Sequence, residues 1–302
     1  MNGRADISGD SFRQDRYGFL RWRILPQPGW EQWWDRIVVA DGIKQRLEDY
    51  SRQAIRLRAR FTQVGMPLHG LILLHGPPGT GKTSLAKGLA NRLGQSTGEI
   101  IFAEVDAHAM PSQMLGESQR NVANLLEKSI PELAAKGPPV VVLIDEVTSV
   151  AVNRQMAMGG TDPVDVVRAT DAALHGLDRL AADHPNVLLV ATSNLEGAID
   201  EAVMSRTDLV VEVPLPDRES RAEILADSLA ELGSVFNSRS AQVRVHQADL
   251  PDLAAELEGL SGRRLRKLVF EALLLVANQG EPALTVDHLR LAAARSGSLP
   301  RT

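Results

Sequence analysis

The fold is decided by the stretch Leu71-Ile72-Leu73-Leu74-His75-Gly76-Pro77-Pro78-Gly79-Thr80-Gly81-Lys82-Thr83-Ser84. An apolar run, a glycine-rich turn and the start of a helical pattern follow one another, as in a buried strand that leads through a phosphate-binding loop into a helix. Its three glycines, Gly76, Gly79 and Gly81, permit positive φ angles and bring backbone N–H groups close to anionic oxygens. The N-terminus of the helix that follows adds to the same anion site.

The polar residues of this loop have defined chemical roles. We expect Lys82 to place its ammonium on the β- and γ-phosphates and Thr83 to offer its hydroxyl to Mg²⁺. ATP and Mg²⁺ are therefore the implied cofactors, and the nucleotide-binding loop consists of Pro78, Gly79, Thr80, Gly81, Lys82, Thr83 and Ser84. The alternative is a glycine turn that binds nothing, which the agreement of strand, loop, Lys-Thr pair and helix disfavours.

The composition narrows the class of protein. The chain has 302 residues, of which 44% are hydrophobic, enough for one large and one smaller packed domain. The net charge of −5 argues against a nucleic-acid partner, and the absence of cysteine excludes disulfides and thiol chemistry. We find no secretion signal and no apolar run of membrane-spanning length, so a cytoplasmic protein without a membrane partner is expected.

Apolar runs alternate with helical patterns from the middle of the chain onward. The expected strands are Leu71–His75, Ile100–Val105, Val140–Ile144, Val187–Ala191 and Leu209–Val213. Helical patterns lie between them at Thr83–Leu93, Glu117–Ser129 and Val164–Ala182. This alternation predicts an α/β fold with a five-stranded parallel sheet and helices on both faces. We expect Gly94 to end the first of these helices as its C′ residue.

Three segments are predicted along the chain. Residues 1–29 are an arm or linker, and burial of aromatic rings anchors it to the body through Trp22, Trp30, Trp33 and Trp34. Residues 30–214 form the large α/β domain, and residues 215–302 form a small all-α lid because only helical periodicity follows Pro216. The expected starts of the lid helices are Asp217, Pro251, Ser261 and Thr285.

Two acids follow the apolar strand Val140–Ile144, at the edge where α/β sheets bind ligands. Asp145 would hold Mg²⁺ directly or through water, and Glu146 would orient and polarise the attacking water. A solvated acidic turn is the alternative. The next strand ends in Asn194, which could bond the γ-phosphate or the lytic water, or only cap the following turn.

Two arginines are candidates for stabilising the transferred phosphate. Arg206 follows a short helical stretch and could reach into a neighbouring subunit, since phosphoryl transfer gains from a cation supplied in trans. A lone surface arginine in an exposed salt bridge is the alternative. Arg263 starts the helix capped by Ser261 and could approach the γ-phosphate, with Arg264 and Arg266 as rivals.

These motifs together resemble the AAA+ ATPases: the glycine-rich loop, Ile144-Asp145-Glu146, Ala191-Thr192-Ser193-Asn194 and the helical lid. A narrower resemblance, to the pachytene-checkpoint AAA+ remodellers of HORMA-domain proteins, rests on Leu143-Ile144-Asp145-Glu146-Val147 and on Gly259-Leu260-Ser261-Gly262-Arg263 with Leu265-Arg266-Lys267-Leu268. It extends from about Trp34 to the C-terminus.

The resemblance implies roles for individual residues. Asn194 corresponds to the sensor-1 residue, Arg206 to the arginine finger and Arg263 to the sensor-2 arginine. Ile37 and Val38 fall where the family lines its adenine pocket. The family works as a homohexamer whose sites are shared between subunits.

Residues 112–118 match the family's first pore loop, which grips a substrate peptide. Here Met114 occupies the commonly aromatic gripping position, and Leu115 follows it. Both are apolar and adaptable. Ordinary core packing of the two side chains is the alternative.

The segment before the ATPase pattern is short. About thirty residues leave no room for the folded recruiting domain of the eukaryotic members. The chain therefore resembles the bacterial members, which act with HORMA proteins and a cyclic-nucleotide synthase in antiphage defence.

Two functions remain open. The first is a Mg-ATP-dependent ring ATPase that remodels or unfolds a HORMA-domain protein, converting it between closed and open states. The alternative is a nucleotide-gated AAA+ binding switch, clamp-loader-like or nucleic-acid-associated, which threads no substrate.

Overall fold

The computed structural model describes residues 19–65, 68–105, 117–147, 163–194, 199–235, 242–279 and 283–297. The chain divides into two compact units. The first consists of Met1–Trp30, Glu48–Leu74 and Leu89–Val210, and the second of Glu31–Leu47, His75–Gly88 and Val211–Thr302. The division of the sequence at residues 29 and 214 stays a prediction.

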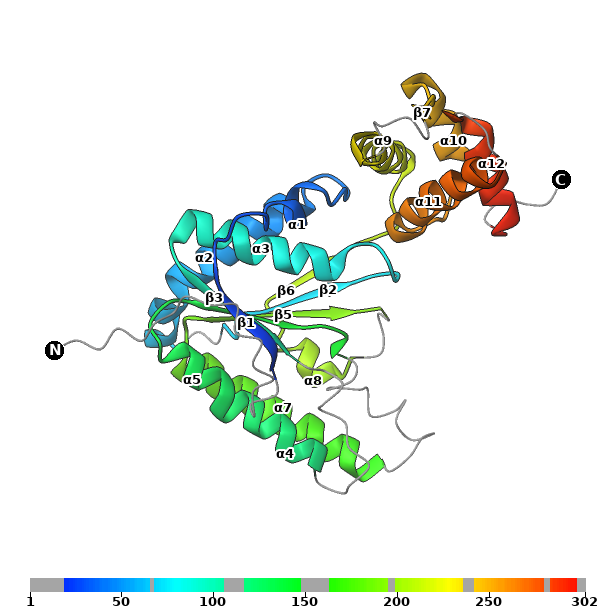
Figure 1. Ribbon diagram of the computed structural model, residues 1–302. Helices are drawn as coiled ribbons and strands as arrows, with labels where there is room; N and C mark the ends of the chain where they lie inside the picture. Colours follow the sequence, from blue (N-terminus) through cyan, green and yellow to red (C-terminus); the bar gives the residue numbers. More distant parts are fainter. Residues whose placement is uncertain are drawn as a thin grey trace. The chain divides into compact units, whose positions relative to one another are not determined.

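A six-stranded sheet organises the fold, with the strand order β1-β3-β4-β5-β2-β6 (Figure 1). The strands are β1 Phe19–Leu25, β2 Leu71–His75, β3 Ile100–Val105, β4 Val140–Ile144, β5 Val187–Ser193 and β6 Leu209–Glu212. β4 pairs in parallel with both β3 and β5. β6 runs along β2 in the same direction, since Asp208 N–H donates to the oxygen of Leu71 and Val213 N–H to that of His75. All five predicted strands are therefore present.

The sixth strand, β1, lies in the segment that we predicted to be an arm or linker. It pairs antiparallel with β3, and Leu25 lies opposite Ile100. Two arginines break its apolar alternation, which is why the pattern did not predict a strand. Both have partners: Arg21 forms an ion pair of 2.7 Å with Glu104, and the guanidinium of Arg23 lies over the ring of Trp30.

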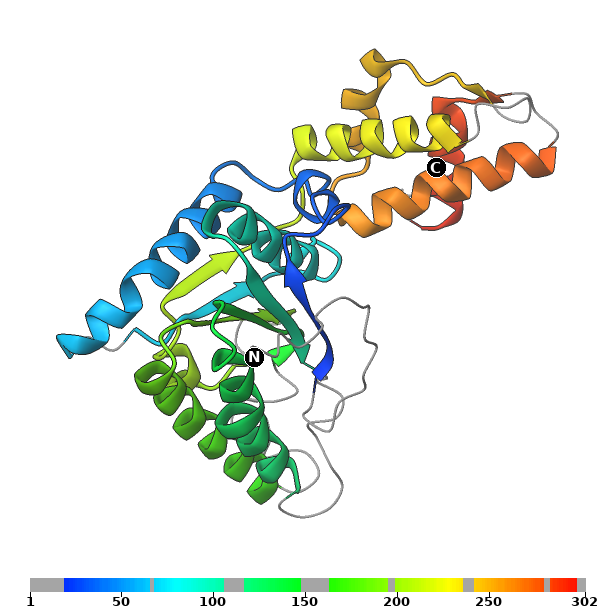
Figure 2. The same cartoon turned by 60° about the vertical axis from the view of Figure 1, so that its left-hand side comes forward.

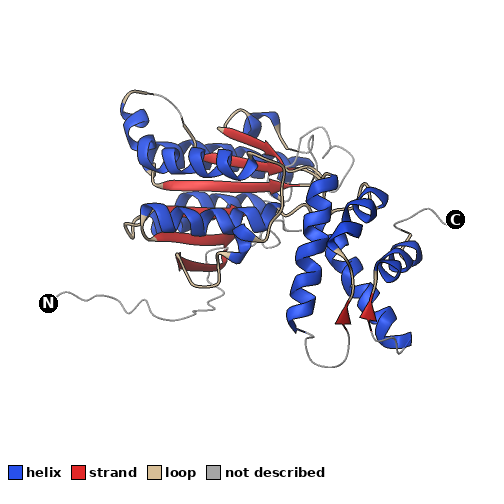
Figure 3. Cartoon of the chain, turned by 90° about the horizontal axis from the view of Figure 1, so that it is seen from above, coloured by secondary structure: helices blue, strands red, loops and turns tan. Residues whose placement is uncertain are grey.

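Helices cover both faces of the sheet, so the strands lie between helical layers (Figure 3). The described helices before the lid are α1 Gln32–Asp35, α2 Ile43–Gln63, α3 Lys82–Thr97, α4 Glu117–Asn124, the π-helix η2 Leu125–Ser129, α5 Ile130–Ala134, α7 Pro163–Asp183 and α8 Glu201–Met204. α4 and α7 lie side by side on the lower face in Figure 1, and Figure 2 shows the same pairing. No helix of the described ranges is both long and apolar enough to cross a membrane.

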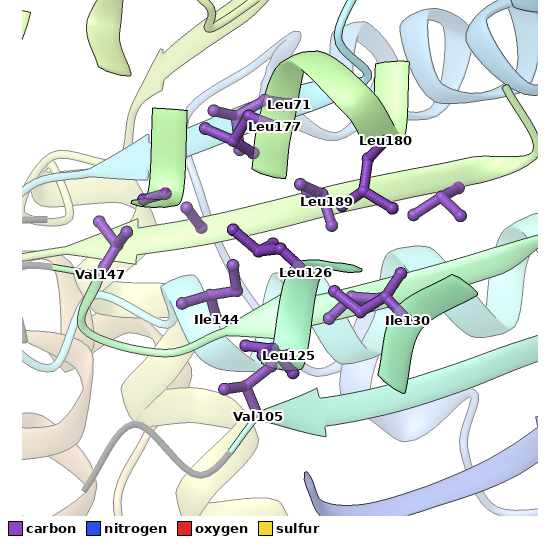
Figure 4. Packing of buried hydrophobic residues seen from close by; sticks show 14 of the residues in the cluster. Leu71, Val105, Leu125, Leu126, Ile130, Ile144, Val147, Leu177, Leu180 and Leu189 are labelled. Atoms are coloured by element: carbon purple, nitrogen blue, oxygen red, sulfur yellow. The ribbon is translucent and has the colours of Figure 1, made fainter. Parts of the chain in front are cut away.

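The core of the first unit lies between this helical face and the strands. Leu125, Leu126 and Ile130 meet the sheet residues Ile144 and Leu189 in one buried cluster (Figure 4). All five side chains are at most 6% exposed. Burial of such side chains is the main driving force for folding, at roughly 25 cal/mol per Å² of apolar surface. The core therefore fixes the strands whose ends carry the polar residues discussed below.

Gly94 does not end its helix, contrary to the prediction. α3 continues to Thr97, and Gly98 follows with a φ of +98°. Gly94 lies inside the helix because the chain after β1 crosses it there, and a Cβ on Gly94 would lie 2.9 Å from the nitrogen of Pro26. Gly88, also inside α3, has the same role for the segment around Trp33, since a Cβ on Gly88 would lie 2.8 Å from the Trp33 backbone.

The lid contains the predicted helices and one element that was not predicted. Its helices are α9 Arg218–Val235, the 3-10 helix η4 Gln247–Asp249, α10 Leu250–Glu256, α11 Gly262–Gln279 and α12 Val286–Arg295. Two short strands, β7 Gln242–Val243 and β8 Ala283–Leu284, pair in parallel, so the prediction of an all-α lid was wrong in this detail. Strands of two residues carry no detectable sequence period.

The predicted helix starts of the lid are confirmed. The carboxylate of Asp217 accepts from Ser220 N–H at 2.8 Å, and Pro251 lies in the first turn of α10. The Ser261 hydroxyl oxygen accepts from Arg264 N–H at 3.4 Å. Thr285 N–H donates to Nδ1 of His288 at 3.2 Å. Local capping chemistry was therefore sufficient to place these helices.

Candidate nucleotide site

The phosphate-binding loop leaves β2 at Gly76 and enters α3 at Lys82. Gly76, Gly79 and Gly81 have φ angles of +140°, +81° and +100°, so all three adopt the backbone conformation that the sequence predicted. Gly76 is required for a second reason: a Cβ there would collide with the carbonyl oxygen of Val213. The loop therefore depends on glycine for both backbone angle and close packing.

Lys82 is held inside the loop. Its ammonium donates to the carbonyl oxygens of Gly76 at 2.8 Å and Pro77 at 2.9 Å, and the residue is 6% exposed. The Thr80 hydroxyl donates to the same Pro77 oxygen at 3.0 Å. Thr83 and Ser84 follow as the next residues of α3. The turn thus positions a cation at the start of a helix, where the helix dipole already favours an anion.

Two distant segments contact this loop within the second unit. Arg263 N–H donates to the carbonyl oxygen of Gly79 at 3.1 Å. A Cβ on Gly81 would lie 3.3 Å from the Ile37 side chain. The predicted adenine-pocket residue Ile37 and the predicted sensor-2 residue Arg263 therefore both lie against the phosphate-binding loop.

The three arginines of the lid helix differ in their partners. Arg264 forms a bidentate pair with Glu271 at 2.8 and 3.2 Å. Arg266 donates to the oxygen of Arg36 at 3.1 Å and lies 3.5 Å from Glu231. Arg263 is exposed and makes no side-chain hydrogen bond within the described ranges. Its two rivals are thus engaged in structural pairs.

A pocket lined mainly by apolar residues lies beside the phosphate-binding loop. Val38, for which an adenine-pocket role stays a prediction, lines it together with Val39, Ala40, Thr80, Pro214, Leu215, Pro216, Asp217, Ile224 and Gly262. The contribution of residues 214–217 was missed. The prolines of that segment were interpreted only as the end of the strand pattern, although they also place chain at the pocket.

The acidic pair follows β4 and is fixed by the neighbouring strand. The Thr192 hydroxyl donates to a carboxylate oxygen of Asp145 at 2.6 Å and accepts from Glu146 N–H at 2.9 Å. Thr192 is 1% exposed. Sequence reasoning missed it, since a threonine inside an apolar strand gives no functional signal. A single buried hydroxyl therefore orients both acids.

Glu146 has an unusual backbone. Its φ of +56° is the only positive value at a non-glycine residue among the described ranges. Such a conformation costs about 1–2 kcal/mol and is found at functional sites. The side chain of Asn194 donates to the Glu146 carboxylate at 2.7 Å. The predicted base and the predicted sensor residue are thus in direct contact.

Arg206 lies where the parallel strands of the sheet begin, which we call the amino edge, whereas the acidic pair lies where they end, at the carboxyl edge. Asp208 N–H donates to the oxygen of Leu71, which places this segment beside the amino end of β2. Asp145 follows the carboxyl end of the parallel strand β4. A strand of five residues spans roughly 16 Å, so Arg206 and Asp145 of one chain lie about that far apart.

Asp178 of α7 is the partner of Arg206. The carboxylate accepts from Nε at 2.7 Å and from Nη2 at 2.8 Å, and Nη1 donates to the oxygen of Ala202 at 2.9 Å. The Arg206 hydrogen bond is the main reason why the pKa of Asp178 lies below its usual range. Arg206 therefore makes the partly exposed salt bridge that the sequence analysis gave as its alternative, although no local pattern identified Asp178 as the partner. Met114 and Leu115, the predicted gripping residues, lie outside the described residues.

Comparisons with known sequences agree with these features. Residues 72–215 match the family model "ATPase family associated with various cellular activities (AAA)". CD-NTase-associated protein 6 of Pseudomonas aeruginosa is 43% identical over 272 residues, which cover 89% of this chain and 88% of that protein. The pachytene checkpoint protein 2 homolog of Oryza sativa subsp. indica is 37% identical over 298 residues, covering 86% of this chain but 62% of that protein.

Solved structures give the same result. The structure of Caenorhabditis elegans PCH-2 is 28% identical with a TM-score of 0.74, covering 94% of this chain and 78% of that one. A chain in the Escherichia coli MS115-1 HORMA:CdnC:Trip13 complex has a TM-score of 0.75 at 20% identity, covering 92% of this chain and 95% of that one. At that identity the second match supports the fold alone.

Proposed function

Because the chain belongs to the AAA ATPases, in the family of CD-NTase-associated protein 6 and pachytene checkpoint protein 2, we propose that its ATPase remodels a partner protein. The working form is a homohexameric ring in which each nucleotide site is completed by a neighbouring subunit. The partner is a HORMA-domain protein, converted between closed and open states.

In this proposal the glycine-rich loop and the acidic pair act on one nucleotide. The N–H groups of the loop and the ammonium of Lys82 bind the phosphates. Thr83 and Asp145 would hold Mg²⁺, because a hydroxyl and a carboxylate are the oxygen ligands that it accepts. Bound Mg²⁺ would neutralise charge on the phosphate oxygens. The described residues contain no cluster of three metal-binding side chains, and a magnesium site completed by phosphate and water needs none.

Glu146 acts as the general base in this proposal. A carboxylate at that position can accept a proton from the attacking water and polarise it. Asn194 holds the carboxylate at 2.7 Å and would lie where an amide can also sense the γ-phosphate. The positive φ of Glu146 supports this assignment, because the chain keeps a strained residue there.

The adenine ring of the nucleotide would enter the pocket lined by Val38 and by Pro214 and Pro216, which follow β6. Ile37 packs on the phosphate loop beside it. Among the three arginines at the start of α11, only Arg263 makes no side-chain hydrogen bond to the described residues, whereas Arg264 is paired with Glu271. This difference supports Arg263 as the residue that contacts the γ-phosphate.

The position of Arg206 is the observation that carries the ring. It lies at the amino edge of the sheet, about one strand length from the Glu146 of its own chain. That distance exceeds the reach of an arginine side chain, so Arg206 does not serve the site of its own chain, and in this proposal it contacts the nucleotide of another subunit. A head-to-tail contact of this kind generates a ring when the rotation between subunits closes, which is the arrangement that we propose.

The names of the relatives support the rest of the proposal. One relative is called CD-NTase-associated, and one matching structure is titled a HORMA:CdnC:Trip13 complex. By analogy we propose an indirect link to a cyclic-nucleotide synthase and a role in antiviral defence. Met114 and Leu115 would grip the partner chain in the central channel.

A subunit-mixing experiment tests the shared site. Arg206→Ala subunits keep their own base, and Glu146→Gln subunits keep their own finger, so neither variant hydrolyses ATP alone. When the two are mixed in equal amounts, random assembly makes roughly a quarter of the sites complete. We expect phosphate release to recover to about that fraction of the wild-type rate. No recovery in rings that demonstrably contain both variants would exclude a finger in trans.

A second experiment separates remodelling from the nucleotide-gated switch. A Met114→Ala variant should bind and hydrolyse ATP but fail to convert a purified HORMA-domain partner. The conversion can be followed by the partner's change in elution or protease sensitivity. If Met114→Ala remodels at the wild-type rate, no chain is gripped at this position and the switch becomes the better hypothesis.

A further inference from the structure

We propose that Asp178 is the positioning residue for Arg206, fixing the guanidinium so that its remaining donors meet a neighbouring subunit's phosphate. The proposal rests on the finger role of Arg206 under the proposed function. It adds that the chain holds this finger ready through a second side chain on α7.

The pair itself is geometrically specific. Two parallel bonds, of 2.7 and 2.8 Å, join the Nε and Nη2 groups of Arg206 to the two carboxylate oxygens of Asp178. A bidentate pair of this kind fixes the plane of the guanidinium as well as its position. The third bond, from Nη1 to the oxygen of Ala202, ties the guanidinium to the end of α8.

The pair leaves part of the guanidinium for a ligand. Arginine has five N–H donors, and these three bonds use one on Nε, one on Nη1 and one on Nη2. One N–H on each terminal nitrogen therefore makes no bond to the described residues. A phosphate can accept both together. Asp178 can thus keep its hold while Arg206 binds in trans.

Asp178 has a second side-chain partner besides Arg206. Nε2 of His69 lies 3.2 Å from the Asp178 oxygen that accepts Nε. The backbone of His69 is itself fixed, because its N–H donates to Asp208 at 3.2 Å and its oxygen accepts from Arg58 at 2.9 Å. Asp208 lies two residues after Arg206. His69, which contacts Asp178, and Arg206 are therefore both anchored close to Asp208.

Stability alone does not account for this pair. The side chain of Asp178 is 46% exposed and that of Arg206 is 23% exposed. Ion pairs of such exposure contribute only modestly to folding, and the bidentate geometry places this pair at the upper end of that modest range. Misplacement of a reacting group by about 1 Å can lower a rate roughly 100-fold. The pair therefore has its larger effect on the placement of the finger.

The test uses Asp178→Asn, which keeps the shape of the side chain and one acceptor but loses the charge. In assembled rings we expect kcat to fall roughly 10-fold, because the finger is misplaced rather than removed. KM for ATP should stay within about twofold, since the free site of the subunit is unchanged. Arg206→Ala should lose roughly 1,000-fold or more. The double variant should match Arg206→Ala alone.

The mixing assay supplies the decisive comparison. Asp178→Asn is placed either on the Glu146→Gln subunit, which donates its finger, or on the Arg206→Ala subunit, which receives one. We expect recovery to fall by about 10-fold only in the first arrangement. Both mixtures contain the same number of altered chains, so any general loss of folding affects them equally.

A neighbouring pair serves as a further control. Glu127→Gln removes the ion pair of 3.4 Å with Arg179, the residue after Asp178, and should leave kcat unchanged. Equal recovery in the two mixing arrangements would overturn the positioning role while leaving the trans finger intact. Full turnover of Arg206→Ala would overturn the finger itself, and with it the role of Asp178.

Discussion

In the first unit, the polar residues at the carboxyl ends of the parallel strands are more exposed than the buried arginine at their amino ends. At the carboxyl edge, Asp145 and Asn194 are half-buried and Glu146 is exposed with a positive φ. At the amino edge, Arg58 is 2% exposed and is surrounded by backbone carbonyls. We infer that the carboxyl edge is left adjustable for chemistry, whereas the amino edge is fixed to carry Arg206.

The amino edge is tied together by two charged residues. The guanidinium of Arg58 donates to the carbonyl oxygens of Leu68 at 3.2 Å, His69 at 2.9 Å, Pro185 at 3.4 Å and Val187. The carboxylate of Asp208 accepts from the hydroxyl of Tyr50 at 3.0 Å and from the N–H groups of His69 at 3.2 Å and Gly70 at 2.6 Å. Burial, together with the Asp208 carboxylate, raises the pKa of Tyr50 well above its usual value. Tyr50 therefore stays a neutral donor.

The largest effect is expected at the carboxyl edge. Glu146→Gln removes the proposed general base and should lower turnover by roughly 10³–10⁴-fold, equivalent to about 4–5 kcal/mol of barrier. Its unfolding midpoint should hardly change, because the side chain is exposed and a glutamine oxygen can still accept the hydrogen bond from Asn194. Steady-state phosphate release and urea unfolding measure the two quantities.

The matched control for Glu146→Gln is Glu132→Gln. Glu132 is exposed on α5, so the substitution should leave both turnover and stability unaltered. Turnover of Glu146→Gln within tenfold of wild type would mean that another group activates the water.

The next largest effect is expected at the amino edge, where a substitution should lower stability and not turnover directly. Arg58→Met leaves four carbonyl oxygens and the carboxylate of Asp208 without their cation, which should cost about 3 kcal/mol of unfolding free energy. Urea unfolding measures the loss. Arg218→Met is the control, since the Arg218 side chain is 55% exposed and its removal should cost less than about 0.5 kcal/mol.

A small loss of unfolding free energy in Arg58→Met would contradict the inferred difference between the two edges. It would mean that the amino edge keeps its structure without the buried guanidinium. The role of this edge as a fixed mount for Arg206 would then have no physical basis.

Sequence patterns singled out the polar residues of the carboxyl edge more readily than those of the amino edge. Asp145, Glu146 and Asn194 follow apolar strands directly, so their local pattern reveals them. Asp178 and Arg58 lie on helices among other charges, where the pattern is that of a solvated face. The partners are distant in sequence: His69 and Asp178 are 109 residues apart. Contacts of that kind are set by tertiary packing and leave no local signal.

Elements were predictable for the same reason. Strands buried on both faces are continuous apolar runs, and the helix starts of the lid have local caps such as Asp217. β1 was missed because its arginines are satisfied by Glu104 and by an aromatic ring of the same unit. Gly94 was misinterpreted because a close backbone approach and a helix end both favour glycine.

The third prediction concerns backbone strain at the carboxyl edge. Glycine adopts a φ of +56° without cost, whereas alanine does not. Glu146→Gly should therefore be more stable than Glu146→Ala by about 1 kcal/mol, although both are inactive. At Glu132, inside α5, the order should reverse, because glycine is the poorer helix former by about 1 kcal/mol. Urea unfolding of the four variants measures both differences. Equal stability of the Glu146 pair would show that the turn relaxes and stores no strain.

The smallest effect is expected for the Asp178–Arg206 pair, through its pH dependence. Arg206 and His69 face the Asp178 carboxylate, and the hydrogen bond from Arg206 holds the pKa of Asp178 below its usual value. A carboxyl whose folded pKa is depressed stabilises the fold above its unfolded pKa, near 3.9, and loses that contribution as the pH falls through the folded value. Wild type should therefore exceed Asp178→Asn by less than about 1 kcal/mol at neutral pH, since the pair is partly exposed. The difference in urea midpoints should shrink as the pH falls below the unfolded pKa, near 3.9, and through the lower folded value. A difference that grew on acidification would mean that Asp178 is protonated in the folded protein and does not hold Arg206 by charge.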